Sequence, residues 1–415
     1  MTSRDSRITV ALGDDVEVFD YKSPVRIRFG IGELRELGAE IGRLGCRRVL
    51  LVANKGPFRQ NGLYEEVRDN ISARGIEVLG MGDIDSNPRL ASVREGAEIC
   101  RRERVEGVVA LGGGSAMDCT KVISAAAKSP RDPWEHIWGP KAPFVESLPT
   151  VFVPTIAATG TETNPWAVIF DEENRWKNAV NADCLYTKLV LADPQAMRTV
   201  PPRLTVWGAM DILSHTFEFY FNGYHRSIFQ NRFSEAIIHS VMECLDILNA
   251  DPQDLRARGE LWWASVMAWG GLTWLGREAP DMACHDLAEG FVPFYDTHHG
   301  ATLGAITPRW MRFLVERGGG KIEEIFSRFA QTIFGLRVAD PAAAARQGVE
   351  AYVRWLKKAG APDSLVELTG APVTEGELAR IVEKTFRDLG RPVGRLLPLR
   401  QEEALSILRE SCRPL

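Results

Sequence analysis

The alternation of short apolar runs with helical segments constrains the fold of this chain more than any other feature of its sequence. Apolar runs of strand type occupy residues 48–52, 76–79 and 105–111, and segments with helical spacing lie between them at 63–73 and 90–103. Apolar runs separated by helices of about ten residues are typical of parallel strands that are covered on both faces. The sequence therefore predicts an α/β region built from βαβ units.

The same pattern continues beyond these strands. A helix is predicted at 115–127, and further strands are predicted at 151–153, 167–170 and 188–192. No internal repeat or low-complexity segment interrupts the pattern. We expect a parallel sheet with helices on both faces over residues 1–198.

The character of the sequence changes after residue 194. Apolar residues between Phe229 and Leu248 recur at three- and four-residue steps, which indicates an amphipathic helix. Residues 261–275 are apolar almost all round and predict a buried helix. We therefore expect an all-helical second domain over residues 199–415, and a ligand in the cleft between the domains.

Composition excludes several classes of protein. The chain has 50 Lys and Arg against 55 Asp and Glu, and this lack of basic excess disfavours nucleic acid as a partner. No apolar run approaches membrane-spanning length, and the first residues do not read as a signal peptide. The seven cysteines are scattered without a CxxC pair, so we expect neither a disulfide framework nor a cysteine zinc site. These features favour a cytoplasmic protein with no membrane partner.

A glycine-rich turn follows the predicted strand at 105–111. It reads Gly112-Gly113-Gly114-Ser115 and leads directly into a predicted helix. Glycines let the backbone approach a ligand closely, and the free N–H groups of a helix start favour an anion such as a pyrophosphate. The spacing is not the dinucleotide fingerprint GxGxxG. The alternative is a capping box between Ser115 and Asp118, and both interpretations can hold together.

A second loop, at residues 154–164, follows the predicted strand at 151–153. It carries Thr155, Thr159, Thr161 and Thr163 among small residues. Their hydroxyls could reach phosphate, ribose or amide groups of a ligand. The alternative is a turn in which these side chains cap local backbone groups.

Aspartate and histidine residues of the second half suggest a metal site. Asp211 and His215 are four residues apart, which places them on one helical face. His285 lies in another helical stretch, and the pair His298-His299 follows a turn. Three histidines with one aspartate can form a four-ligand site for a divalent ion. Asp211 and His215 could instead simply pair with each other.

Taken together, these segments resemble the iron-containing (group III) alcohol dehydrogenases, and most closely the butanol dehydrogenase-like branch. The matching motifs are GGGSAMDCTK at 112–121, PTIAATGTE at 154–162, GAMDILSHTFE at 208–218 and HHG at 298–300. The similarity extends from about residue 29 to about residue 312. Four ordered motifs are far more specific than any one of them.

The resemblance implies a dehydroquinate synthase-like fold, with a dinucleotide-binding domain at 1–198 and a helical metal-binding domain at 199–415. It also implies a catalytic ion, Fe²⁺ or alternatively Zn²⁺, held by Asp211, His215, His285 and His299. The spacing within the family favours His299 over His298. The implied cofactor is NAD or NADP, and the implied assembly is a homodimer.

The resemblance further implies a set of cofactor-binding residues. They are Asn54, Asn87, Gly113, Gly114, Ser115, Asp118, Thr155, Thr159, Thr161 and Lys177. NAD-preferring members often carry an aspartate where this chain has Asn54, so Asn54 with the adjacent Lys55 favours NADP. Many members carry a second histidine where this chain has Glu289, so a proton relay through that histidine cannot be transferred. Asn87 with Pro88 could alternatively begin a helix.

The function implied is that of a metal-dependent, NAD(P)-linked alcohol dehydrogenase or aldehyde reductase. It would move a hydride reversibly between nicotinamide and a small primary alcohol or aldehyde. The alternatives are a dehydroquinate synthase-like lyase and a polyol (glycerol-type) dehydrogenase. The lyase needs clustered cations for its phosphorylated substrate, and only Arg203, Arg277 and Arg309 lie near the ligand motifs. A metal-binding protein without catalysis would leave the glycine turn without a purpose.

Overall fold

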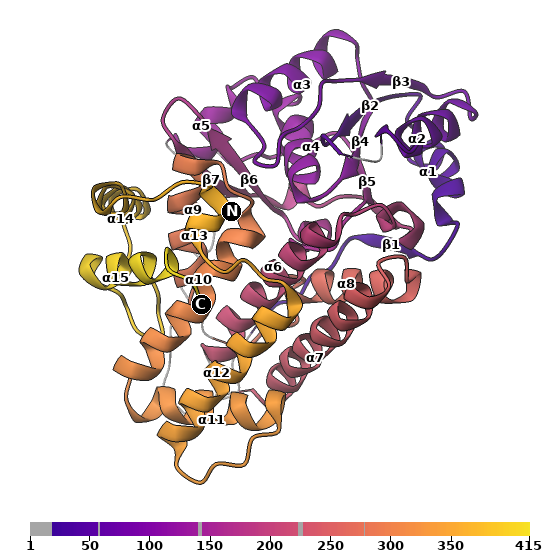
Figure 1. Ribbon diagram of the computed structural model, residues 1–415. Helices are drawn as coiled ribbons and strands as arrows, with labels where there is room; N and C mark the ends of the chain where they lie inside the picture. The colour runs from indigo at the N-terminus through magenta and orange to yellow at the C-terminus, as the bar shows by residue number, and fades with distance from the viewer. Residues whose placement is uncertain (1–18, 57–58, 140–142, 223–226, 278) are drawn as a thin grey trace.

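The computed structural model describes residues 19–415 except 57–58, 140–142, 223–226 and 278, and it divides into a sheet-containing half and a helical half (Figure 1). A six-stranded parallel sheet has the strand order β1-β8-β5-β4-β2-β3. Its strands are β1 (Arg26–Phe29), β2 (Arg48–Ala53), β3 (Glu77–Gly80), β4 (Gly107–Gly112), β5 (Thr150–Pro154) and β8 (Leu189–Ala192). The predicted parallel sheet is confirmed.

Helices cover both faces of this sheet, as predicted. They are α1 (Leu37–Arg43), α2 (Leu63–Ser72), α3 (Leu90–Arg102) and α4 (Gly114–Ala126). The short helix α5 (Pro133–Ile137) contacts α3. Leu50 and Val52 of β2 pack in one core with residues of α3 and α4. Val49 and Leu51 point to the opposite face and pack in a second core with residues of α1 and α2. Side chains alternate between the faces of a strand, and the continuous apolar run of β2 fills both cores.

The strand predicted at 167–170 does not belong to the parallel sheet. It lies in β6 (Trp166–Asp171), which pairs antiparallel with β7 (Trp176–Asn181), a strand that the sequence analysis missed. Only residues 172–175 join the two strands. A parallel connection needs a crossover of about a dozen residues or more, so this short link permits only a hairpin.

The second half of the chain is helical, as predicted. Its long helices are α6 (Pro202–Phe221), α7 (Ile228–Ala250), α8 (Leu255–Ala268), α9 (Ala283–Tyr295), α10 (His299–Arg317), α11 (Gly320–Phe334) and α12 (Pro341–Ala359). It also contains α13 (Leu365–Thr369), α14 (Glu375–Leu389) and α15 (Gln401–Ser411). Short 3-10 helices lie before α6: η1 (Glu33–Glu36), η3 (Thr161–Thr163), η4 (Asp183–Leu185) and η5 (Pro194–Met197). The change from sheet to helices falls between β8 and α6, and the predicted boundary at 198/199 lies in this interval.

Helix α8 is shorter than the helix predicted over 261–275. It ends at Ala268, because Gly271 has a φ of +99°, which is outside the helical range. A Cβ at Gly270 would also lie only 2.6 Å from the carbonyl oxygen of Val266. The early end turns Trp269 toward His215, with ring centroids 4.8 Å apart.

Helix α6 is the centre of the helical half. It contacts α7, α8, α9 and α10, and nearly all of its residues after the first turn are buried. A helix that is buried on all sides is expected to be apolar all round. Its polar residues are therefore expected to have a partner or a function. Within the described residues, no helix combines the length and the apolar character needed to cross a bilayer.

Candidate functional site

Two of the predicted metal ligands lie on the buried helix α6. Asp211 and His215 are one turn apart, and their side chains are 3% and 9% exposed. The Oδ1 atom of Asp211 lies 3.6 Å from Nε2 of His215. This distance is too long for a hydrogen bond, so the structure does not show the simple Asp–His pair considered as the alternative.

The other two predicted ligands come from α9 and α10. The ring of His285 stacks on that of His215 with centroids 4.7 Å apart. His299, the first residue of α10, places Nε2 3.9 Å from Oδ1 of Asp211. Ligand atoms of Asp211, His215 and His285 all lie within 4.8 Å of one another. His298 is directed elsewhere, with its ring 5.0 Å from that of Trp207.

Two atoms of this cluster test whether it fits a metal ion. Oδ1 of Asp211 and Nε2 of His285 are buried, and neither has a hydrogen-bond partner among the described residues. Leaving such polar atoms unsatisfied is costly, and a cation between them removes the cost. One carboxylate with imidazole nitrogens is a ligand set that suits Fe²⁺ and Zn²⁺. The residues present therefore fit a divalent ion.

The protonation of the cluster follows from its burial. Burial raises the pKa of the Asp211 carboxyl to about 6. Burial also holds the pKa values of His215 and His299 well below the usual histidine value. Both imidazoles are therefore neutral at pH 7, which is the form that binds a metal ion.

Glu218 is a site residue that the sequence analysis missed. It lies on α6 and is fully buried, with Oε2 2.5 Å from Nδ1 of His285. Its Oε1 also accepts a hydrogen bond from the backbone N–H of His285, at 3.2 Å. Burial opposes a charge on His285, but the Glu218 carboxylate outweighs burial and raises the pKa of His285 to about 9.

The contact with Glu218 fixes how His285 can act. A carboxylate at Nδ1 orients the ring and leaves Nε2 for a metal ion, an arrangement that recurs at metal sites in proteins. The signal was present in the motif GAMDILSHTFE, because Glu218 lies three residues after His215 and therefore near it on the helix surface.

The glycine turn begins α4 without a capping side chain. Gly113 is the N-cap and, having no side chain, supplies no capping group of its own to the helix. The capping box predicted for Ser115 and Asp118 is therefore wrong, because the helix begins one residue before Ser115. The hydroxyl of Ser115 donates instead to the carbonyl oxygen of Ser86. The uncapped N–H groups at the start of α4 form the kind of site that binds a phosphate.

The glycines are also needed for packing against the threonine loop. A Cβ at Gly114 would lie 2.6 Å from Oγ1 of Thr159, and one at Gly113 would lie 2.7 Å from Cγ2 of Ile156. Gly112 adopts a φ of +153°, which favours glycine. Asn54 holds the turn from the other side, because its Oδ1 accepts a hydrogen bond from Gly113 N–H at 2.9 Å.

A buried lysine, which the sequence analysis also missed, organises the threonine loop. Nζ of Lys121 on α4 donates to Oγ1 of Thr161 at 2.7 Å and to the carbonyl oxygens of Thr161, Asn164 and Trp166 at 2.6–2.9 Å. Burial lowers the pKa of Lys121 to about 8. The Thr161 hydroxyl in turn donates to Asp118 at 2.6 Å. Thr161 and Asp118 thus have partners within the protein, and their cofactor role stays a prediction.

The remaining predicted residues surround the same region. Thr155 is buried directly after β5. Lys177 lies on β7, and its charge opposes the rise that burial causes in the pKa of both Asp118 and Asp211. Its charge therefore acts on both the glycine-turn helix and the metal cluster. Asn87 does not begin a helix as the alternative required, because α3 starts at Leu90; its Nδ2 donates to Asp296 at 2.8 Å.

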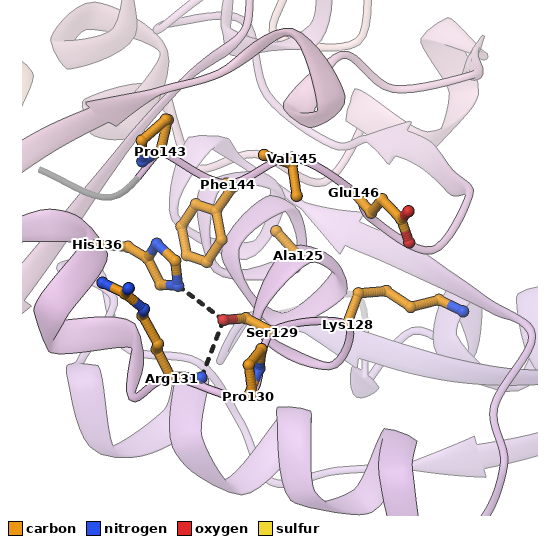
Figure 2. Close-up of a pocket in the computed structure, with 10 residues that line it drawn as sticks. All are labelled: Ala125, Lys128, Ser129, Pro130, Arg131, His136, Pro143, Phe144, Val145 and Glu146. Atoms are coloured by element: carbon orange, nitrogen blue, oxygen red, sulfur yellow. Dashed lines mark hydrogen bonds between the residues drawn. The ribbon is translucent and has the colours of Figure 1, made fainter.

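A surface pocket of about 240 Å³ lies apart from these residues (Figure 2). It is next to the C-terminal end of α4, whereas the glycine turn is at the N-terminal end. His136 there stacks on Phe144, and its Nε2 lies 2.8 Å from the hydroxyl oxygen of Ser129. None of the predicted site residues lines this pocket.

Comparisons with known proteins match this arrangement along nearly the whole chain. Residues 24–194 match the family described as iron-containing alcohol dehydrogenase. Residues 205–412 match the C-terminal part of the Fe-containing alcohol dehydrogenase family.

Individual relatives agree with these family matches. The chain is 32% identical to the NADH-dependent butanol dehydrogenase A of Clostridium acetobutylicum over 394 residues, which cover 95% of this chain and 99% of the relative. It is 30% identical to an NADPH-dependent aldehyde reductase of Escherichia coli, over 70% of this chain and 74% of that protein. The crystal structure of the NADH-dependent butanol dehydrogenase A of Thermotoga maritima superposes with a TM-score of 0.89 at 34% identity, covering 96% and 99% of the two chains. This chain belongs to the iron-containing alcohol dehydrogenase family, among its butanol dehydrogenase-like members.

Proposed function

We propose that the protein is a metal-dependent, NAD(P)-linked alcohol dehydrogenase or aldehyde reductase that acts on a small primary alcohol or aldehyde. The observation that carries this proposal is the convergence of Asp211 with three histidines in one buried cluster. The charge of Lys177 acts both on that cluster and on Asp118 of α4. A metal site beside a dinucleotide site is the arrangement that hydride transfer to a polarised carbonyl requires.

The ligand set of the ion is Asp211, His215, His285 and His299, and the ion is Fe²⁺, with Zn²⁺ suited to the same atoms. When bound, the ion supplies a Lewis acid that polarises a carbonyl oxygen and lowers the pKa of an alcohol. The Asp211 carboxylate offsets part of the ion's charge. The neutral imidazoles add no negative charge, so the ion keeps the remaining positive charge. Trp269 packs on His215 at 4.8 Å and on Phe219 at 5.1 Å, and this aromatic wall keeps water from the cluster.

The cofactor lies at the carboxyl ends of β2, β4 and β5, where ligands bind in open α/β sheets. Gly113, Gly114 and Ser115 present the start of α4 to its pyrophosphate. Thr155 and Thr159 line the side formed by the loop after β5. Lys177 and Asn87 would line the rest of the cofactor site.

The buried arginines argue against the lyase alternative. Arg277 donates to the carbonyl oxygen of Phe219 at 2.9 Å, and Arg309 donates to the carbonyl oxygens of Ala305 and Asp363 at 3.0 and 2.8 Å. Both guanidiniums are thus used within the fold. Arg203 lies over the ring of Trp207 at 4.6 Å. A single such cation is a poor site for a phosphorylated sugar acid.

A homodimer in a reducing cytoplasm is consistent with the surface and the cysteines. Strand β1 is at the edge of the sheet; Phe29 at its end and Ile31 just after it are exposed. An exposed edge strand with apolar neighbours favours pairing with another chain. All seven cysteines are free thiols.

The first prediction concerns the reaction. Protein loaded with Fe²⁺ is expected to oxidise NADH when butanal is added, to lose this activity on chelation and to regain it with Fe²⁺. The measurement is the loss of nicotinamide absorbance with time. Metal-loaded protein that turns over neither butanal nor other short aldehydes with either nicotinamide would contradict the proposal.

The second prediction concerns the ligand set. His285→Ala removes one of four ligands and should lower metal affinity or activity by about tenfold or more. His298→Ala is the matched control and should change both by less than about twofold, since its ring faces Trp207. The bound metal is measured after dialysis. If His298→Ala loses the ion and His285→Ala keeps it, the proposed set is wrong.

The third prediction concerns Glu218. Glu218→Gln preserves the size of the side chain. Its single amide oxygen can accept from only one of the two groups that Glu218 contacts, the backbone N–H and the Nδ1–H of His285, and its NH₂ group then faces the other. We expect metal affinity to fall about 10- to 100-fold, the usual effect of losing the partner of a ligating histidine. Isothermal titration with Zn²⁺ at constant pH measures it. Unchanged affinity in a folded Glu218→Gln protein would show that Glu218 has no role in holding His285.

The fourth prediction concerns the choice of cofactor. The sequence analysis used Lys55 as support for NADP, but in the structure this lysine is already paired. Its ammonium pairs with Asp85 at 2.6 Å. Nearby, Arg59 pairs with Asp83 at 2.5 Å and Arg89 with Asp296 at 2.7 Å. The described cations of this region are therefore all paired, and none is left for the 2′-phosphate of NADP. We expect NADH to be preferred, as its kcat/KM against that for NADPH will show.

Variants at two neighbouring positions sharpen this test. Asn54→Asp should lower kcat/KM for both cofactors, because it loses the hydrogen bond from Nδ2 to the carbonyl oxygen of Ile84 and so loosens the glycine turn. Lys55→Gln should leave the cofactor ratio within about twofold, because this exposed lysine is already paired. A strong NADPH preference that Lys55→Gln abolishes would restore the sequence-based expectation.

A further inference from the structure

A single carboxylate, that of Asp296, links the two halves of the molecule at the edge of the site. Its Oδ1 accepts a hydrogen bond from Nδ2 of Asn87 at 2.8 Å. Its Oδ2 accepts one from Nη2 of Arg89 at 2.7 Å. Asn87 and Arg89 belong to the α/β half, whereas Asp296 belongs to the helical half.

Each end of this link lies next to residues of the proposed site. Asp296 follows α9, which carries His285, and precedes His299 at the start of α10. The segment 86–89 contacts the glycine-turn helix, because Ser86 accepts a hydrogen bond from Ser115. The same segment contacts the hairpin that carries Lys177, because Arg89 lies over the ring of Phe170 at 4.7 Å. Asp296 therefore joins the cofactor side of the site directly to the metal side.

The halves also meet at other places, and the contact at α8 differs in nature from that of Asp296. Nε1 of Trp262 on α8 donates to Oε1 of the fully buried Glu162 at 2.9 Å. Gly160 lies so close to α8 that a Cβ there would be 2.4 Å from the carbonyl oxygen of Ser265. Figure 1 shows α8 beneath β1 on the right and α9 beside β7 on the left, with α6 between them. The contact at α8 is tight and buried, whereas the side chain of Asp296 is 58% exposed.

The buried contact at α8 has the character of a hinge, and the exposed contact of Asp296 has the character of a latch. We propose that Asp296, with Asn87 and Arg89, forms an interdomain latch that must open for a nicotinamide dinucleotide to enter or leave, while the contact at α8 stays closed. The proposal rests on the dinucleotide site described above. Asp296 acts as a positioning residue, because it touches neither the metal cluster nor the glycine turn.

Arg89 has two further carboxylates near it on its own half. Its guanidinium also lies 3.4 Å from Oε1 of Glu172 and 3.9 Å from Oδ2 of Asp85. When Asp296 moves away, Arg89 therefore keeps carboxylate partners on its own half. A half-exposed ion pair is also screened by salt, so ionic strength should favour the open form.

The test replaces the charge of Asp296 and keeps its shape. Asp296 has a φ of +50°, a conformation that asparagine tolerates and alanine does not, so Asp296→Asn is the suitable variant. Stopped-flow fluorescence of metal-loaded protein gives the association and dissociation rates of NADH. We expect both rates to rise about three- to tenfold, the effect of one charge-assisted contact at a partly exposed site. Because both rates rise, Kd should change by less than either.

Three controls separate the latch from a loss of structure. Asp246→Asn removes a comparably exposed carboxylate, 46% exposed and paired with Lys358 within the helical half, and should leave both rates unchanged. Arg89→Met combined with Asp296→Asn should add little to the larger single effect, since both remove one contact. Raising the salt concentration should speed NADH release in the wild type more than in Asp296→Asn.

The outcomes are distinct. Amides of segment 86–89 should exchange with deuterium faster in Asp296→Asn even without ligand, which reports the contact independently of the cofactor. NADH binding to the wild type with rates that Asp296→Asn does not change would overturn the latch alone. A slower association or a Kd raised as much as the dissociation rate would also overturn it. A wild type that binds neither NADH nor NADPH would overturn the latch and the proposed function together.

Discussion

The buried polar face of α6 is the constraint on which the rest of the structure depends. A helix enclosed by four others carries Asp211, His215 and Glu218 among its apolar residues. Taking carboxylates out of water is costly unless each finds a compensating charge or donor. Glu218 pairs with His285. Oδ1 of Asp211 has no hydrogen-bond partner among the described residues, and a cation would compensate its charge. Helices α9 and α10 are held against α6 in the positions that provide these partners.

The start of α10 lies so close to α6 that its position tolerates no larger side chain at the contact. A Cβ at Gly300 would lie 2.2 Å from the carbonyl oxygen of Trp207, so any larger residue would push the start of α10 away. His299, which immediately precedes this glycine, would move with it. The HHG sequence thus combines a ligand with the glycine that lets it reach the cluster.

In the α/β half, the sheet brings the cofactor residues together. Asn54 follows β2, the glycine turn follows β4 and the threonine loop follows β5, and these strands are neighbours in the sheet. Lys121 and Asn54 then tie the three loops to one another through backbone groups. The hairpin β6–β7 carries Lys177 from this side toward the metal cluster. Rigid elements therefore position both halves of the site, and the ionic contact of Asp296 joins them at an exposed edge.

Much of this architecture could be predicted from the sequence, because its elements are set by local periodicity. The parallel strands and their covering helices follow from apolar runs and helical spacing. The hairpin was missed because β6 is as apolar as a parallel strand, and only its short link to β7 reveals the pairing. The end of α8 was missed because Gly270 and Gly271 interrupt a segment that is otherwise apolar.

The site was harder to predict, because its contacts join distant parts of the chain. The ligand set came from a family resemblance, since spacing alone left His298 and His299 as rivals and the start of α10 separates them. Glu218 and His285 are 67 residues apart, and Lys121 and Thr161 are 40 apart. Periodicity carries no information about such pairs. The preference predicted for NADP rested in part on Lys55, and its pairing with Asp85 could not be read from periodicity, for the same reason.

The most direct test of the central claim is a crystal structure of the protein with Fe²⁺ and NAD⁺, with the metal located by anomalous scattering. The account predicts a single strong peak at about 2.0–2.2 Å from a carboxylate oxygen of Asp211 and from one ring nitrogen each of His215, His285 and His299. It also predicts a pyrophosphate at the start of α4 and Nδ1 of His285 still bound to Glu218. A peak coordinated by His298, or a metal bound away from Asp211, would contradict it.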